Sequence, residues 1–222
     1  MTKTIVITGA AGALGRLVAR KFAERGDNLA LLGRDKGKLE ALARDLSLPA
    51  ERTLALEVDL SDGEAVRASV EAVASRFKPI HGLIHLVGGW TGGRTLPDSD
   101  PKDFALMLSQ HAFTTYHLLR NLAPHLAQSR EGRVVVVSNP VATQPVAKSA
   151  LYAAAKAAQE SLTLTLAEEF KENGLTANVI QVRSIDVKGE AKGTTPAEIA
   201  AAILYLFSTE ANKVNGARIP LY

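Results

Sequence analysis

A glycine-rich turn close to the start of the chain restricts the possible folds more than any other feature. The apolar run 3–8 leads into Gly9-Ala10-Ala11-Gly12-Ala13-Leu14-Gly15, and a helical pattern begins directly behind this turn. A second apolar run, at 28–32, follows that helix. The order strand, glycine turn, helix and strand is typical of a parallel sheet whose strands are connected by helices.

Gly9, Gly12 and Gly15 are spaced three apart, which is a weak signal alone because small residues also let a helix pack closely on a strand. Their place between a strand and a helix favours another interpretation, in which glycine lets the backbone approach a diphosphate. The free N–H groups at the start of the helix then face the negative charge. We therefore expect a dinucleotide-binding turn here.

Strands and helices alternate along the whole chain. We expect strands at 3–8, 28–32, 52–58, 82–87, 133–137, 176–182 and 217–220. Helical patterns separate them, including long segments at 101–125 and 149–173, and capping boxes at Ser61–Glu64 and Thr195–Glu198 predict two helix starts. The chain shows no linker, so we predict one α/β domain over 1–222, with a doubly wound parallel sheet between two layers of helices.

Composition excludes several classes of function. The chain has no cysteine, so redox chemistry would need a bound cofactor. No apolar run approaches the roughly 20 residues that span a bilayer, and we expect a cytoplasmic protein with no membrane partner. The net charge is +3, but basic and acidic residues are interleaved, as in Arg34-Asp35-Lys36, so we expect no nucleic-acid partner.

Tyr152 and Lys156 are four residues apart in a predicted helix, which places a phenol and an ammonium on one face. A nearby cation favours phenolate and would lower the pKa of the tyrosine toward the range useful for acid–base chemistry. The same spacing also arises by chance in an ordinary amphipathic helix. The pair alone does not decide between the two interpretations.

The glycine turn, the order of elements and the Tyr-x-x-x-Lys pair together resemble the short-chain dehydrogenase/reductase family. The resemblance extends to the tail, where Asn215-Gly216 is similar to the start of the family's last strand. It implies a Rossmann-type fold and an NAD(P)-dependent oxidoreductase. In the family the tyrosine, here Tyr152, passes a proton to a substrate carbonyl oxygen, and the lysine, here Lys156, lowers the tyrosine pKa and binds the nicotinamide ribose. The implied cofactor contacts are Gly9, Ala11, Gly12, Leu14, Gly15, Arg34, Asp59, Leu60, Val87, Gly88, Tyr152, Lys156 and Ile185.

Arg34 directly follows the second strand, and Gly33 stands where members that prefer NAD usually carry an acidic residue. Such an acid would bond the ribose 2′-hydroxyl, whereas arginine pairs with a 2′-phosphate. We therefore predict that NADPH is favoured over NADH.

Several positions depart from the family pattern around the site, and two of them concern candidate catalytic residues. The family's catalytic serine lies thirteen residues before the tyrosine, where this chain has Asn139, and Ser138 is one residue too early. A one-residue shift on a strand reverses the side chain's face, so Ser138 substitutes only if the loop is longer by one. Asn139 could instead donate an amide hydrogen bond to the carbonyl oxygen. His111 replaces the family's helix asparagine and is a candidate proton relay, although a satisfied helix histidine explains it equally well.

We expect a small-molecule substrate that is a carbonyl, quinone or pterin compound. The segment Ser184–Thr194 is short for a substrate-covering loop, which predicts an open pocket. The runs 12–15 and 88–93 resemble the dihydropteridine reductase branch, although Gly33-Arg34 departs from that branch's acidic residue. Trp90 could stack on a planar ring or simply plug its loop.

Two other classes of function stay open, namely a nucleotide-binding sensor without turnover and a purely structural domain. The five histidines lack the spacing of a metal site, so we expect no metal. By analogy with the family we expect a homodimer or homotetramer, for which the helices at 101–125 and 149–173 carry enough apolar surface.

Overall fold

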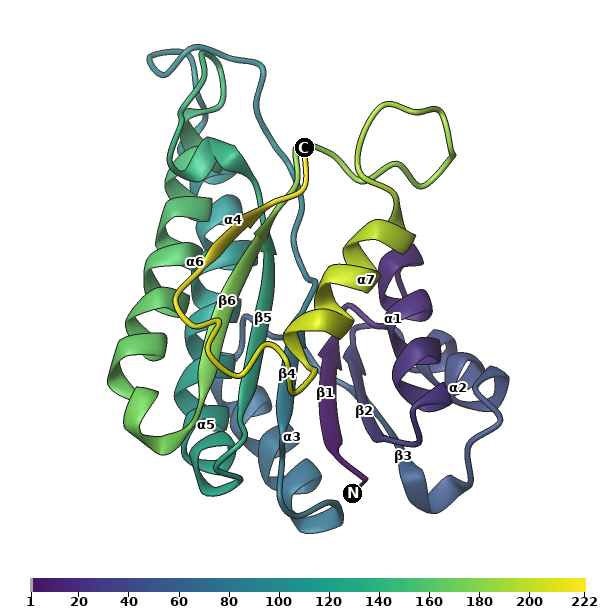
Figure 1. Ribbon diagram of the computed structural model, residues 1–222. Helices are drawn as coiled ribbons and strands as arrows, with labels where there is room; N and C mark the ends of the chain where they lie inside the picture. Colours follow the sequence, from purple (N-terminus) through teal and green to yellow (C-terminus); the bar gives the residue numbers. More distant parts are fainter. Residues whose placement is uncertain (1) are drawn as a thin grey trace.

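Seven strands form one parallel sheet in the computed structural model, which describes residues 2–222 (Figure 1). Their order across the sheet is β3-β2-β1-β4-β5-β6-β7, so the chain winds outward from β1 in one direction and from β4 in the other. The strands are β1 (Thr4–Thr8), β2 (Asn28–Gly33), β3 (Thr53–Glu57), β4 (Gly82–His85), β5 (Arg133–Ser138), β6 (Thr176–Gln181) and β7 (Arg218–Pro220). This arrangement confirms the predicted fold class.

Helices cover both faces of the sheet (Figure 1). One layer contains α1 (Ala13–Glu24), α2 (Lys36–Asp45) and α7 (Pro196–Leu206). The opposite layer contains α3 (Gly63–Arg76), α4 (Pro101–Leu108), α5 (Thr114–Gln128) and α6 (Ala150–Glu169). Short helical turns are η1 (Ala50–Arg52), η2 (Ser109–Phe113), η3 (Pro140–Ala142) and η4 (Lys171–Asn173).

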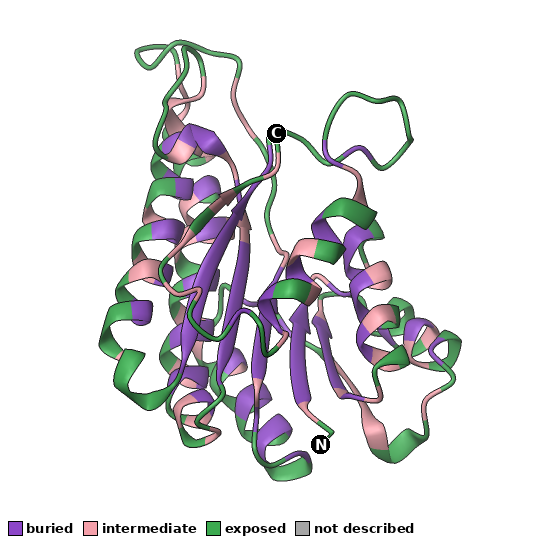
Figure 2. Ribbon diagram, in the orientation of Figure 1, coloured by how far each residue is buried: buried purple, intermediate pink, exposed green. Residues whose placement is uncertain are grey.

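Alternation along the strands divides the core into two clusters. Ile5 and Ile7 pack with α1, α2 and α7, whereas Val6 between them packs with α3, α5 and α6. Successive side chains of a strand point to opposite faces, and both faces here meet a helix layer. The central strands are therefore buried along their length (Figure 2), and their carboxyl ends are held at one edge.

One local expectation needs correction. Ser61 does not cap α3, because Asp62 is the N-cap and accepts hydrogen bonds from the N–H groups of Glu64 at 2.9 Å and Ala65 at 3.2 Å. The expected helix at 101–125 is confirmed, and the π-helical turn η2 joins α4 to α5 within it. That turn carries His111 toward the end of β4. The capping box at Thr195–Glu198 is confirmed.

None of the helices within residues 2–222 combines the length and the apolar character that a membrane crossing requires.

Candidate active site

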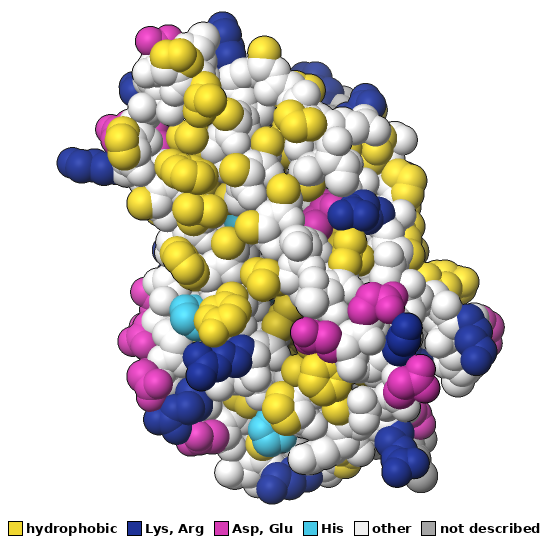
Figure 3. All heavy atoms as spheres, turned by 90° about the vertical axis from the view of Figure 1, so that its left-hand side faces the viewer, with side chains coloured by type: hydrophobic (Ala, Val, Ile, Leu, Met, Phe, Trp, Pro, Cys, Tyr) yellow, Lys and Arg dark blue, Asp and Glu magenta, His cyan; other side chains and the backbone are white. Residues whose placement is uncertain are grey.

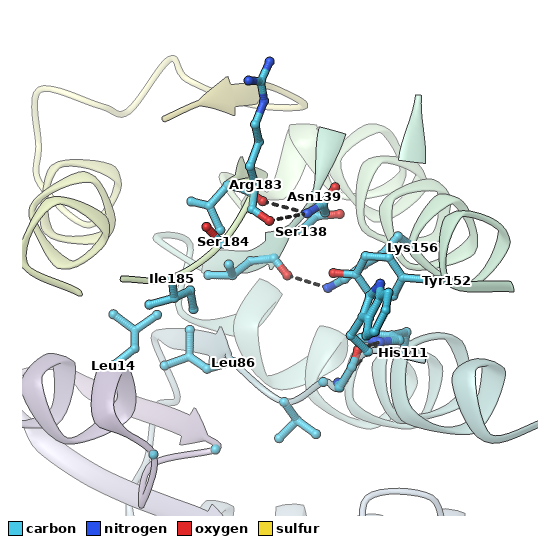
Figure 4. Close-up of a pocket in the computed structure, with 18 of the residues that line it drawn as sticks. Leu14, Leu86, His111, Ser138, Asn139, Tyr152, Lys156, Arg183, Ser184 and Ile185 are labelled. Atoms are coloured by element: carbon cyan, nitrogen blue, oxygen red, sulfur yellow. Dashed lines mark hydrogen bonds between the residues drawn. The ribbon is translucent and has the colours of Figure 1, made fainter. Parts of the chain in front are cut away.

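A pocket of about 720 Å³ lies at the carboxyl ends of the central strands (Figure 4). Ligands bind at this edge in doubly wound sheets. The pocket brings together twelve of the predicted site residues: Gly9, Gly12, Leu14, Gly15, Val87, Gly88, His111, Ser138, Asn139, Tyr152, Lys156 and Ile185. Residues far apart in the sequence therefore share one cavity, with the glycine turn at one end and Tyr152 at the other.

The glycine turn has the geometry of a phosphate cradle. Gly9 has a φ of +69°, and a Cβ on Gly15 would lie 2.3 Å from the carbonyl oxygen of Gly9, so neither position accepts a side chain without rearrangement. Gly12 is the N-cap of α1 and offers no side chain to the first N–H groups of that helix. These donors face the pocket end and fit an anionic diphosphate.

Four predicted cofactor contacts are not among the residues that line this pocket: Ala11 lies in the glycine turn, and Arg34, Asp59 and Leu60 lie near the ends of β2 and β3. Arg34 is exposed directly after β2, close enough to Asp59 for its charge to act on that carboxylate. The pKa of Asp59 lies below its usual value, chiefly because the Ser61 hydroxyl and N–H donate to it, with a smaller contribution from Arg34. Ala11 is half-buried, and the Leu60 side chain is buried in the core, which leaves Leu60 only its backbone for a nucleotide.

Tyr152 and Lys156 lie on the first turns of α6 and both line the pocket. The Lys156 ammonium nitrogen is 5.9 Å from the centre of the Tyr152 ring and donates to the carbonyl oxygen of Val137 at 2.9 Å. Burial raises the pKa of Tyr152 to about 12, which is opposite to the predicted direction. Burial also lowers the pKa of Lys156 to about 7, so the cation that was expected to favour phenolate is itself only partly charged at neutral pH.

His111 packs its ring edge-on against Tyr152, with ring centres 5.4 Å apart. Its Nε2 lies 2.9 Å from the carbonyl oxygen of Gly89 and 3.5 Å from the N–H nitrogen of the same residue. We assign the proton to Nε2 because the shorter contact is to an oxygen that only accepts. Burial, with a smaller effect of Lys156, lowers the pKa of His111 to about 4, so the ring is neutral at pH 7. A Cβ on Gly88 would lie 2.5 Å from the ring, which explains the glycine there.

Asn139 and Ser138 differ sharply in their surroundings. Both N–H groups of the Asn139 amide are used, because Nδ2 donates to the carbonyl oxygens of Val182 at 3.0 Å and Arg183 at 2.9 Å. Its Oδ1 accepts from the N–H of Val141 at 2.9 Å. Asn139 therefore has no free N–H with which to fill its predicted role. The Ser138 hydroxyl is buried and finds no hydrogen-bond partner within residues 2–222.

Several polar residues around the site were not among the predicted catalytic or cofactor-binding residues. His85, at the end of β4, bonds the Thr8 hydroxyl through Nδ1 at 2.7 Å, and burial lowers its pKa to about 3. Gln159 and Thr115 bond each other beside Lys156. One sequence feature could have indicated Gln159, because it is a polar residue within an Ala-rich stretch of a predicted helix.

The loop between β6 and α7 lines the pocket with Arg183, Ser184, Ile185 and Val187. Asp186 accepts the backbone N–H groups of Glu190 at 3.0 Å and Ala191 at 2.8 Å, and the Ser184 hydroxyl donates to the carbonyl oxygen of Lys192 at 2.8 Å. The loop therefore closes on itself, and Figure 1 shows it standing away from the helices near α7. Trp90, 63% exposed, lines the pocket from another loop.

Within the described part of the chain, no three His, Cys, Asp or Glu side chains are grouped so that they could hold a metal ion.

Comparison with known proteins identifies the class of this site. The family model described as short chain dehydrogenase matches residues 3–196. The chain belongs to the short-chain dehydrogenase/reductase family and is an oxidoreductase of that type. An uncharacterized oxidoreductase of Staphylococcus epidermidis is 24% identical over 220 residues, covering 96% of this chain and 94% of that protein.

Solved structures show the same fold. ElxO with NADP bound matches with a TM-score of 0.91 at 21% identity, covering 100% of this chain and 97% of that one. The 3-ketoacyl-(acyl-carrier-protein) reductase from Brucella melitensis, complexed with NADH, matches with a TM-score of 0.88 at 24% identity, covering 99% of this chain and 96% of that one. The enzyme class predicted from the sequence is confirmed.

Proposed function

We propose that this protein reduces a carbonyl or quinonoid substrate with NADPH and that Tyr152 is the general acid. The observation that carries the proposal is the single cavity in which Tyr152 and Lys156 face the glycine turn. When bound, the nicotinamide cofactor supplies the hydride. The glycine turn and the N-terminus of α1 would hold its diphosphate, and Lys156 has one N–H beyond its two protein acceptors with which to bind the ribose.

Tyr152 suits the reducing direction. Its raised pKa keeps the phenol protonated at neutral pH, so the proton is available to the substrate oxygen when negative charge develops there. We assign the second hydrogen bond to that oxygen to Ser138, whose buried hydroxyl has no partner within the described residues. Asn139 then has a different task, which is to hold the backbone at Val182 and Arg183 in place.

The preference for NADPH rests on Arg34. Its guanidinium is exposed at the end of β2, and Gly33 offers no carboxylate to a ribose hydroxyl. Neighbouring structures carry both NADP and NADH, so the support for this preference comes from Arg34 itself.

A panel of ketones, quinones and quinonoid dihydropterins, each with NADPH and with NADH, tests the proposal. Turnover of at least one class with a higher kcat/KM for NADPH supports it. A thermal shift with NADPH but no oxidation of NADPH by any substrate would instead indicate a nucleotide sensor. The absence of any shift with either nucleotide would indicate a structural domain.

A quinonoid pterin is the second candidate substrate, and Trp90 favours it. The indole lines the pocket while being 63% exposed, which makes its face available to a planar ring. We expect Trp90→Ala to raise the KM for a dihydropterin by roughly tenfold and to leave the KM for a small aliphatic ketone unchanged. Equal effects on both substrates would remove the pterin from consideration.

We also propose that the protein is a homodimer or homotetramer. A groove of about 340 Å³ runs between α5 and α6, lined by Leu119, Leu162 and Phe170 among others. Figure 3 shows hydrophobic side chains gathered among charged ones on the face formed by these helices. Light scattering over a range of concentrations measures the mass of the assembly, and a monomer at all concentrations would contradict the proposal.

A further inference from the structure

The Lys156 ammonium is held by two acceptors inside the protein. The side chain is only 5% exposed, and Nζ donates to the Val137 carbonyl oxygen at 2.9 Å and to Gln159 Oε1 at 2.8 Å. The first acceptor belongs to the backbone of β5 and cannot be altered by substitution. The second is a side chain one turn along α6, so the direction of the third N–H depends on Gln159.

Gln159 is itself fixed at its other end. Its side chain is fully buried, and Nε2 donates to the Thr115 hydroxyl at 3.1 Å. That hydroxyl donates to the carbonyl oxygen of His111, in the π-helical turn, with the two oxygens 2.6 Å apart. A continuous set of hydrogen bonds therefore runs from Lys156 on α6 to the turn that carries His111, through residues that exclude water.

We propose that Gln159 is a positioning residue which, braced by Thr115, holds the ammonium of Lys156 so that its free N–H points into the pocket; this rests on the reductase function proposed above. A buried amide is costly unless both of its ends are bonded, and an alanine or leucine would pack here without that cost. Both ends of the Gln159 amide are bonded, one of them to the lysine that the site requires.

The charges around Lys156 are few and come from three directions. His85 and His111 approach from β4 and from the π-helical turn, and both are neutral at pH 7 because burial lowers their pKa values. Glu160 lies beside Gln159 on α6, fully buried, where Gln181 Nε2 donates to it at 2.9 Å and Arg218 Nε at 2.6 Å. Glu160 favours the charged lysine against the effect of burial.

Gln159→Met tests the proposal, because methionine has a similar length and offers no comparable acceptor to the ammonium. We expect kcat to fall about tenfold to a hundredfold and the NADPH dissociation constant to rise by about tenfold, as for the loss of a hydrogen bond to a charged group. Gln159→Glu keeps an oxygen acceptor for the ammonium but loses the N–H that bonds Thr115, so it should restore part of kcat. It should also move the alkaline limb of the pH profile upward, since a carboxylate favours the charged lysine.

Thr163→Val is the matched control. Thr163 lies one turn further along α6, is equally buried, and bonds only the backbone carbonyl oxygen of Gln159 at 2.9 Å. It should leave kcat, KM and the pH profile unchanged. If Gln159→Met does not fold, as judged by circular dichroism, Thr115→Val replaces it, because it removes the brace and should lower kcat in the same direction by a smaller factor.

The pH titration of the Lys156 Cε signal by NMR, assigned with Lys156→Met, gives a readout independent of turnover. We expect Gln159→Met to change the pKa and broaden the signal of Lys156, and Thr163→Val to do neither. If Gln159→Met changes the titration of Lys156 but the unaltered protein reduces no substrate, the reductase proposal is contradicted and the positioning role of Gln159 is still supported. A folded Gln159→Met with kcat, NADPH affinity and Lys156 titration like those of the unaltered protein would overturn the inference.

Discussion

The two ends of the pocket present different chemical groups to a ligand. At the glycine turn, the groups offered to a ligand are backbone N–H groups, and the positions that matter are those where a Cβ has no room. At the other end, Tyr152, Lys156, Ser138 and His111 are side chains from three different elements. Added side-chain volume should therefore disturb the glycine-turn end most, whereas a change of charge or proton affinity should disturb the end that holds Tyr152. The following substitutions test that difference.

The largest effect is expected from Tyr152→Phe. Removing the phenolic hydroxyl removes the general acid, so kcat should fall by about 10²- to 10⁴-fold. NADPH affinity, measured by fluorescence titration, should change by less than about threefold, because the phosphate end is untouched. Tyr205→Phe, at a half-exposed position of α7, is the control and should leave kcat and NADPH affinity unchanged. A Tyr152→Phe enzyme that keeps a tenth of its kcat would exclude Tyr152 as the acid.

Arg34→Glu tests the one charged side chain assigned to the nucleotide end. The substitution replaces a partner of the 2′-phosphate with a like charge, and we expect the ratio of kcat/KM for NADPH to that for NADH to fall about a hundredfold. Arg44→Glu, on an exposed turn of α2, controls for the change in net charge. An unchanged ratio would show that Arg34 does not determine the preference for NADPH over NADH.

Gly15→Ala tests the volume rule. The added Cβ would lie 2.3 Å from the Gly9 carbonyl oxygen and 2.7 Å from the Cα of Ala10, both of which belong to backbone. We expect the free energy of unfolding, from urea titration, to decrease by about 1–3 kcal/mol, with weaker NADPH binding. Gly37→Ala is the control, because its Cβ would meet only Asp35 Oδ1 at 3.6 Å, and it should not destabilise the protein. Equal stabilities would contradict the close packing.

The smallest effect concerns the pH dependence of stability through Lys156. Its pKa is about 7 in the folded protein against an ordinary value of 10.5, so between these values the unfolded chain binds the proton more tightly. The contribution of Lys156 to stability is therefore least favourable below pH 7 and improves as the pH rises, by at most about 1.4 kcal/mol per pH unit. Urea titrations at pH 7 and 8 should show the free energy of unfolding of the unaltered protein rising by about 1 kcal/mol relative to that of Lys156→Met. A constant difference between the two would contradict the lowered pKa.

The same division explains what the sequence could predict. Strand positions, helix positions and the glycine turn follow from patterns local to each element, such as the apolar run of β1 and the spacing of Gly9, Gly12 and Gly15. The pairing of Tyr152 with Lys156 is also local, since both lie on one helix. These features were predicted because no distant partner decides them.

Features that depend on distant partners were not predicted correctly. The hydrogen bonds of the Asn139 amide depend on carbonyl oxygens more than 40 residues away, and the sequence around Asn139 does not indicate these partners. The pKa of Tyr152 depends on how deeply α6 is buried, which opposed the effect expected from its neighbour. The π-helical turn that carries His111 packs against α6, so its surroundings depend on a helix that lies further along the chain.

The loop that Asp186 ties to its own backbone has a consequence for binding. Because these hydrogen bonds join residues of the loop to each other, they fix the shape of the loop before any ligand arrives. A molecule that binds against it should therefore not have to order these residues, and the loss of conformational entropy on binding should be small there.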